Sequence, residues 1–448
     1  MSAPESLLGW GGIVRLGLVQ AALGSVVVLT TSTFNRVMIV ELMLPAMLPG
    51  ALVALYYSVQ MLRPRLGYGS DLGGRRTPWI LGGMLLLAAG AASAAAAIAL
   101  MEHNTRLGIG LAVLSFVVIG VGVGAAGTSL LVLIAKRVHP DKRSGAATIV
   151  WLMTLTGFIV TTIVVGQILD PFSYERLFMI TASVGAVAFS ITVLALWGVE
   201  GSARPPAVAP TDGAPPTPET AKTPFRQAFM QVWREPDARV FALFVFVSMF
   251  AYSAQNLILE PFAGAVFGYT PGESTTLSGI QNIGILTGMI LVAFVGGALG
   301  FIRIGSMRSW MIAGCLASAL GLFGLALAGF IGPAWPLRLS VFLLGAGLGV
   351  FAVAAIWSMM GLVGRGRERR EGLRMGLWGA AQAVAFGLGS LLGTTAIDLT
   401  RYLFDSVVLA YATVFTAEAL LFLLAGALAA RVSAAQTRTP ADGLRLNP

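Results

Sequence analysis

Twelve long apolar runs constrain the fold of this chain more than any other feature of its sequence. A helix needs about 20 predominantly apolar residues to cross a bilayer. Runs of this length are too long for barrel strands and do not alternate in polarity, so only helices fit them. The predicted spans are residues 13–34, 44–62, 79–100, 108–134, 146–169, 177–197, 240–259, 274–299, 310–331, 337–363, 373–397 and 405–430.

The composition indicates an integral membrane protein. The 448 residues are 56% hydrophobic and 11% charged, whereas a soluble protein carries about 25% charged residues. The net charge of +9 does not indicate nucleic-acid binding, because the basic residues lie in short loops between apolar spans, where they set topology. The single cysteine, Cys315, excludes an intrachain disulfide.

The distribution of basic residues predicts the orientation. Loops on the cytoplasmic side of a membrane protein carry an excess of Lys and Arg. Of the 29 Lys and Arg residues, all but five lie in one alternating set of segments, which includes both termini. We therefore expect both termini of this multi-pass membrane protein to be cytoplasmic. The five exceptions are Arg36, Arg106, Arg176, Arg338 and Arg401.

The two halves of the chain resemble each other. Gly120-x-Gly122-x-Gly124 in the fourth span matches Gly345-x-Gly347-x-Gly349 in the tenth, and the following span ends near Asp170 in one half and Asp398 in the other. A polar stretch rich in Pro and Ala separates the halves. We predict six-helix halves at 1–199 and 238–432, a cytoplasmic linker at 200–237 and a cytoplasmic tail at 433–448. This all-α arrangement of parallel repeats is the major facilitator type.

The loop after the second span supports this fold. It contains Gly67, Asp71, Gly74, Arg75 and Arg76 in a pattern that looks like the major facilitator signature Gly-x3-Asp-Arg-x-Gly-Arg-Arg, with a leucine in place of the first arginine. We expect a tight turn whose aspartate meets a helix N-terminus or an arginine, and whose arginines lie at the inner leaflet.

Two polar stretches interrupt the apolar pattern, and ionisable groups at the edge of hydrocarbon invite a functional interpretation. The first stretch is Asn35-Arg36-Val37-Met38-Ile39-Val40-Glu41, and the second is Gln255-Asn256-Leu257-Ile258-Leu259-Glu260. A regular helix does not align groups five residues apart, as Arg36 and Glu41 are. These two groups either cap a helix end at the outer surface, or contact a ligand and line a central cavity. The candidate residues are Asn35, Arg36, Glu41, Gln255, Asn256 and Glu260.

Other motifs have plainer interpretations. Glu418 stands alone within the twelfth span, as either a proton-coupling carboxylate or a protonated, hydrogen-bonded helix contact. Gly122-x-Gly124-x-x-Gly127 spells a dinucleotide fingerprint but lacks the preceding strand, so close helix packing is favoured. No spacing nominates a metal site or a catalytic set, and the two histidines, His103 and His139, lie in loops. We therefore expect no enzymatic activity.

The polar stretches also resemble a known family. Asn35 to Leu42 followed by Pro45-Ala46, the segment Arg75 to Trp79, and Leu259-Glu260-Pro261-Phe262 with Gly264 are similar to the PucC/LhaA family of purple phototrophic bacteria. This family, also called the bacteriochlorophyll delivery family, is a branch of the major facilitator superfamily. The resemblance covers nearly the whole chain.

The resemblance implies an assembly factor for light-harvesting complexes in the bacterial inner (intracytoplasmic) membrane. Such a protein binds bacteriochlorophyll or a precursor as cargo, delivers it to antenna polypeptides and has bacteriochlorophyll synthase as a further partner. Because no histidine is embedded, the pigment's Mg²⁺ would need another ligand, with Glu41, Asn256 and Glu260 as candidates. Many family members carry an acid at the position of Asn256 and a tyrosine at that of Phe262. These differences leave three branches of the family as alternatives: assembly factors of light-harvesting complex 1, those of light-harvesting complex 2, and proteins associated with pigment synthesis. The alternative from another class is a secondary transporter, proton-coupled or not, for a small amphipathic solute.

Overall fold

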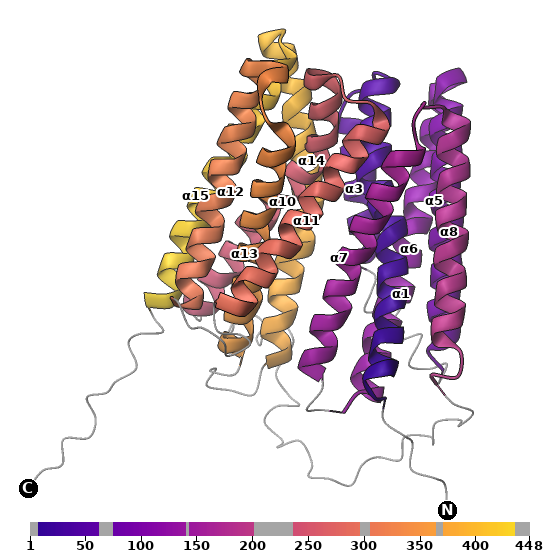
Figure 1. The fold of residues 1–448 in the computed structure, drawn as a ribbon, viewed down its shortest axis with the longest axis vertical. Coiled ribbons are helices and arrows are strands. Elements are labelled where there is room, and N and C mark those ends of the chain that lie inside the picture. The colour runs from indigo at the N-terminus through magenta and orange to yellow at the C-terminus, as the bar shows by residue number, and fades with distance from the viewer. Residues whose placement is uncertain are drawn as a thin grey trace, which may run out of the picture.

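The computed structural model describes residues 8–61, 75–139, 143–200, 236–295, 305–363 and 371–434, which form a bundle of long helices without a strand (Figure 1). The first helical run joins α1 (Trp10–Val28), η1 (Leu29–Thr33), α2 (Phe34–Arg36) and η2 (Val37–Glu41). The remaining elements are α3 (Met47–Gln60), α5 (Thr77–His103), α6 (Thr105–Arg137), α7 (Arg143–Ile168), α8 (Tyr174–Leu196), α10 (Pro236–Phe267), α11 (Pro271–Val295), α12 (Met307–Ile331), η4 (Gly332–Ala334), α13 (Leu337–Val363), α14 (Glu371–Phe404) and α15 (Val407–Ala434).

These elements confirm the predicted all-α membrane fold. Within the described residues, eleven helical runs are long and apolar enough to cross a membrane, and α3 adds a shorter helix with 14 described residues. The predicted linker, the C-terminal tail and the signature residues Gly67, Asp71 and Gly74 fall mostly or wholly outside the described residues. The domain boundaries therefore stay a prediction.

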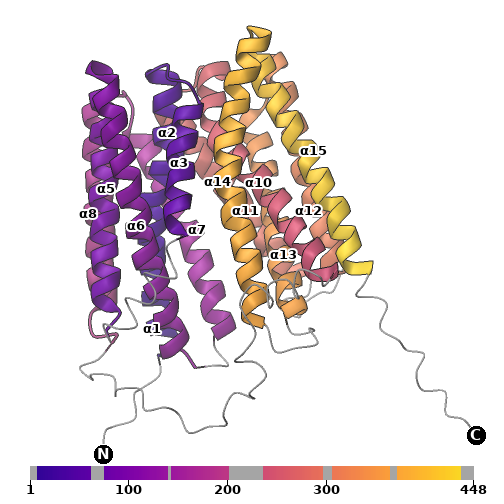
Figure 2. The ribbon, with the colours of Figure 1, turned by 180° about the vertical axis from the view of Figure 1, so that it is seen from behind.

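The helices pack as two groups, one from α1 to α8 and the other from α10 to α15 (Figures 1 and 2). Apolar side chains such as Leu16, Ile80 and Phe116 form a buried cluster that lies mainly within the first group. A second cluster, which includes Phe351 and Phe422, lies mainly within the second group. Each cluster also takes in apolar residues of the other half, Leu257 in the first cluster and Ile39, Ala46 and Leu155 in the second, so apolar packing and polar side chains both join the halves.

Both ends of the bundle can be named from the first helical run. We call the end where α1 begins and α15 ends the near end, and the opposite end, where η2 stops, the far end (Figure 1). The predicted ends of the first and seventh spans, at residues 34 and 259, are wrong, because the helices continue to Glu41 and Phe267. The polar stretches consequently lie inside helices and between the halves.

Glycines allow close packing between neighbouring helices, which is the interpretation that the sequence analysis favoured for the glycine motif. In α6, a Cβ atom added at Gly122 would lie 2.6 Å from the amide nitrogen of Leu87 and 2.7 Å from the carbonyl oxygen of Gly83, both in α5. Gly349 in α13 faces the backbone of Ile285 in α11 in the same way. The glycine motifs shared by the two halves therefore bring helix backbones into contact.

This packing gives a matched pair of substitutions on α6. We expect Gly122→Ala to destabilise the purified protein by about 1–3 kcal/mol, because overpacking forces the two backbones apart. Gly110 on the same helix has open space around it, so Gly110→Ala should leave the melting temperature unchanged or slightly raised. Equal melting temperatures for the two variants in detergent would contradict the close contact between α5 and α6.

Candidate functional site

Two π-helical segments shape the far half of the first helical run. The hydroxyls of Thr30 and Thr31 donate to the carbonyl of Val27 at 2.8 and 3.0 Å, and such side-chain bonds compete with the backbone pattern. In η1 the Phe34 amide accordingly donates to the carbonyl of Leu29, five residues earlier. In η2 the Leu42 amide donates to the carbonyl of Val37 at 3.1 Å, again five residues earlier. Each segment adds one residue to a helical turn.

The wider turn of η2 aligns Arg36 with Glu41. Arg36 Nη1 donates to Glu41 Oε1 in an ion pair, although Arg36 is only 2% exposed and Glu41 is 32% exposed. The prediction that a spacing of five residues separates these groups is therefore wrong, because it assumed a regular α-helix. Arg36 Nη2 also donates to the carbonyl of Tyr269 at 2.7 Å, just beyond the end of α10. Arg36 thus contacts the C-terminus of a helix in the other half, a favourable place for a cation.

Gly264 makes room for this guanidinium. A Cβ atom at Gly264 would lie 3.0 Å from Arg36 Nη2 and 3.2 Å from its Nε. The Nε atom has no hydrogen-bond partner among the described residues. Gly264, four residues beyond the second polar stretch, therefore makes space for the arginine of the first.

Asn35 bonds to the carbonyl that a proline leaves free. Pro261 lies inside α10 and has no amide proton, so the carbonyl of Leu257, four residues earlier, loses its usual partner. The Nδ2 atom of Asn35 donates to this Leu257 oxygen. This bond crosses from the first half to the second. Asn35 therefore gives the Leu257 carbonyl a hydrogen-bond partner and also joins the halves.

Glu260 lies at the centre of a buried hydroxyl cluster. Ser32 Oγ in η1 and Ser278 Oγ in α11 each donate to Glu260 Oε1 at 2.5 Å, and the two hydroxyl oxygens lie 3.2 Å apart. Thr33 Oγ1 lies 3.2 Å from Thr275 Oγ1 in α11. All five side chains are buried. The hydroxyl-bearing partners were missed in the sequence, where the run Thr30-Thr31-Ser32-Thr33 was the available signal.

Gln255 and Asn256 have different surroundings. Gln255 Oε1 accepts a hydrogen bond from Gln281 Nε2 at 3.0 Å, and both residues are buried in the second half. Asn256 is half-buried, and its side chain has no hydrogen bond among the described residues. Of the predicted site residues in the second polar stretch, Asn256 therefore has the free, reachable amide.

An aromatic group lies one turn from Asn256. Tyr252 and Tyr57 approach Phe386 with ring centroids 5.8 and 5.1 Å away. All three rings are half-buried, and Tyr57 comes from α3 of the first half. Residues four apart share a helix face, so Tyr252 and Asn256 point to the same side of α10. This arrangement offers flat apolar rings beside a free amide.

Glu418 is not joined to the other candidate residues by any hydrogen bond. It is buried within α15, and neither of its carboxyl oxygens has a hydrogen-bond partner in the described part of the chain. The predicted hydrogen-bonded helix contact is therefore not found at Glu418 among these residues.

The repeated aspartates join the halves at the far end. Asp398, near the end of α14, accepts from the amides of Ala46 at 2.9 Å and Met47 at 2.7 Å, where α3 begins. Asp170 accepts from the Thr270 hydroxyl at 2.5 Å and from the Gly272 amide at 3.2 Å, at the start of α11. Each aspartate therefore caps a helix of the opposite half, where a negative charge is favourable.

At the near end, the described part of the signature loop meets a glutamate. Glu200, which follows α8, accepts from the backbone amides of Arg76 and, at 2.9 Å, Thr77, so it caps the start of α5. Arg75 is exposed and Arg76 is buried. This carboxylate takes the helix-capping role that the sequence assigned to Asp71, which lies outside the described residues.

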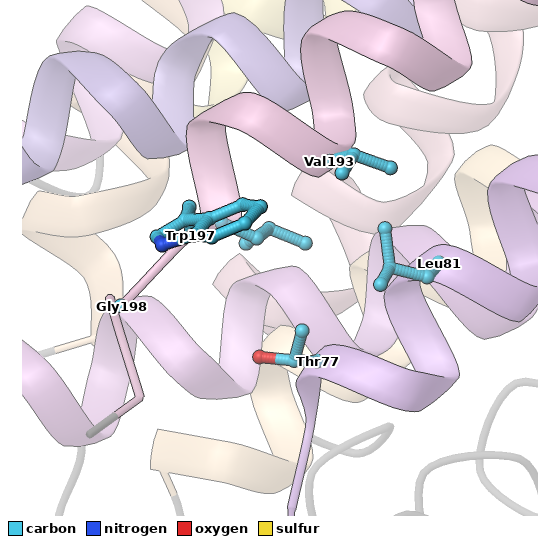
Figure 3. A pocket seen from close by; sticks show the side chains of 6 residues that line it. Thr77, Leu81, Val193, Trp197 and Gly198 are labelled. Atoms are coloured by element: carbon cyan, nitrogen blue, oxygen red, sulfur yellow. The ribbon is translucent and has the colours of Figure 1, made fainter. Parts of the chain in front are cut away.

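A lateral pocket of about 240 Å³ lies beside this contact, between α5 and α8 (Figure 3). Its lining is mostly apolar, and Trp197 at its edge is 75% exposed. None of the predicted site residues lines it, so it is separate from the polar interface between the halves. The lining residues are Thr77, Leu81, Val193, Leu196, Trp197 and Gly198.

The fold places this chain among major facilitator-type membrane proteins. A bacterial homologue of the human lysosomal transporter Spinster, solved in an inward-facing and unoccupied conformation, matches with a TM-score of 0.70 and 15% identity, over 98% of this chain and 100% of that chain. A peptide transporter POT bound to sulfate matches with a TM-score of 0.66 and 16% identity, over 95% and 96% of the two chains. At these identities the likeness shows the fold alone.

The family follows from sequence. The model of the PUCC protein family matches residues 33–437, and this chain belongs to that family. It is 49% identical to the bacteriochlorophyll synthase 44.5 kDa chain of Rhodobacter capsulatus, over 96% of this chain and 97% of the relative. Protein PucC of Rhodobacter capsulatus is 28% identical, over 93% and 91% of the two chains. The predicted family is therefore confirmed.

The bond between Asn35 and Leu257 predicts a coupling between two substitutions. Asn35→Ala should destabilise the protein by about 1–2 kcal/mol, because it leaves a buried carbonyl without a partner. In a Pro261→Ala background, residue 261 regains an amide proton that can bond to Leu257, so Asn35→Ala should cost clearly less. The measurement is the free energy of unfolding across the double-mutant cycle. Additive effects would show that Asn35 does not compensate for Pro261.

Proposed function

We propose that this chain is a non-catalytic assembly factor of the bacterial inner membrane. It would hold bacteriochlorophyll or a precursor and deliver the pigment to antenna polypeptides. The observation that carries this proposal is 49% identity over nearly the whole chain to a protein named as a bacteriochlorophyll synthase chain, together with the PUCC family match. The lower identity of 28% to Protein PucC favours the branch linked to pigment synthesis.

A role in delivery rather than catalysis agrees with the chemistry of the polar interface. Asn35, Arg36 and Gln255 are engaged in contacts between helices. The fold is shared with transporters, which move a molecule without changing it. Bacteriochlorophyll synthase is then proposed as a partner that supplies the pigment.

Asn256 is the best-placed candidate to hold the pigment. Glu260 Oε1 already accepts two hydroxyls, and Glu41 is engaged with Arg36. The free amide of Asn256 can offer oxygen to Mg²⁺, directly or through a water. The neighbouring rings of Tyr252, Tyr57 and Phe386 can stack against a macrocycle.

The test is the absorption spectrum of protein purified gently from phototrophically grown cells. We expect bacteriochlorophyll bands in the wild type and about tenfold weaker pigment retention in Asn256→Leu, the scale of losing one well-placed metal contact. Gln167→Leu, which removes an exposed amide from α7, is the control and should keep the pigment. A colourless wild-type preparation, together with normal antenna assembly in a deletion strain, would refute the proposal.

Secondary transport of a small amphipathic solute is the second candidate. The fold match to Spinster and POT and the buried carboxyl group of Glu418 favour it. Transport predicts dependence on an ion gradient in proteoliposomes, whereas the assembly role requires none. Solute uptake that is lost in Glu418→Gln, from a preparation without pigment, would support this second candidate over the first.

A further inference from the structure

The cluster around Glu260 brings together side-chain oxygen atoms from three helical segments. Ser32 comes from η1, Glu260 from α10, and Ser278 from α11, with both hydroxyls 2.5 Å from the same carboxyl oxygen. Thr275 lies beside the carboxyl and contacts Thr33 at 3.2 Å. We call these five residues the hydroxyl site. Residues of both halves contribute to it, and all are buried.

Two buried oxygen atoms, one in the hydroxyl site and one on a residue close to it in sequence, have no hydrogen-bond partner among the described residues. They are Glu260 Oε2 and the Oδ1 atom of Asn35, which lies one turn beyond Ser32. Native proteins rarely leave such atoms unsatisfied, and a bound ion or water is the usual explanation.

The local charges leave Glu260 without a dedicated counter-ion. Arg36 lies within electrostatic range of Glu260, but it forms its ion pair with Glu41 and its remaining bond with the Tyr269 carbonyl. The pair formed by Arg36 and Glu41 is neutral as a unit. A buried carboxylate in a membrane is costly without a compensating charge.

We propose that the hydroxyl site binds a small monovalent cation, Na⁺. Carboxylate, hydroxyl and amide oxygens are hard ligands, which suit hard cations. One carboxylate balances one positive charge, and the described residues contain no group of three His, Cys, Asp or Glu side chains that would favour a divalent ion. The site lies against the irregular turn of η1, and broken or irregular helices form the ion sites of membrane transporters.

Such an ion would bind the two halves together. Its ligands Ser32 and Thr33 belong to the first half, and Glu260, Thr275 and Ser278 belong to the second. Binding therefore stabilises the contact between the halves and is lost when the halves separate. Ion binding is measured without pigment, so its outcome is independent of pigment handling.

The test compares Na⁺ with choline at constant ionic strength on the purified full-length protein. We expect a saturable rise of several degrees in melting temperature with Na⁺, because a ligand that binds only the folded state stabilises it. Radioactive ²²Na⁺ should bind to a single saturable site. The rise in melting temperature and the binding of ²²Na⁺ should both disappear in Glu260→Gln. In Ser278→Ala the affinity for ²²Na⁺ should fall at least tenfold.

The control is Ser253→Ala on the same helix as Glu260. Ser253 is buried and bonds to Ser390 and the Phe386 carbonyl within the second half, away from the hydroxyl site. This variant should keep the full Na⁺ response. If Glu260→Gln does not fold, Ser32→Ala takes its place in the comparison. A wild type that responds to pH but not to Na⁺, or a Na⁺ response that survives in Glu260→Gln or Ser32→Ala, would overturn the proposal.

Discussion

The burial of one guanidinium between two helical halves governs the structure of the far end. Arg36 is almost fully buried in a chain that spans a membrane, so every favourable partner must come from the protein. Glu41 supplies charge, the Tyr269 carbonyl supplies a helix end, and Gly264 supplies space. The π-helical turn of η2 makes the first of these contacts possible, because it aligns Arg36 with Glu41.

Other polar side chains also form hydrogen bonds across the interface between the halves. Asn35 crosses to the carbonyl freed by Pro261, and Ser32 crosses to Glu260. Asp170 and Asp398 occupy matching places in the repeat and each caps a helix of the opposite half. Directional bonds therefore add to the apolar packing between the halves, where Leu257 joins the first apolar cluster and Ile39 and Leu155 join the second.

Sequence patterns predicted the architecture well because hydrophobic length, basic loops and the repeated glycines depend on local composition. They also identified the two polar stretches as unusual. The pairing of Arg36 with Glu41 was not predictable, because it depends on the π-helical turn of η2, which helical periodicity does not indicate. The bond from Asn35 to Leu257 joins residues 222 positions apart. A proline inside a helix marks a free carbonyl, but its partner is known only from the fold.

The central claim is that Arg36 holds the far ends of the halves together. The most direct measurement is the distance between spin labels placed at Glu102 and Tyr402, two exposed positions at the ends of α5 and α14, in a chain with Cys315 replaced by alanine. Pulsed electron paramagnetic resonance should give one narrow distribution for the otherwise unchanged chain. Arg36→Met should broaden this distribution and shift it to longer distances. An identical distribution in the folded Arg36→Met variant would contradict the claim.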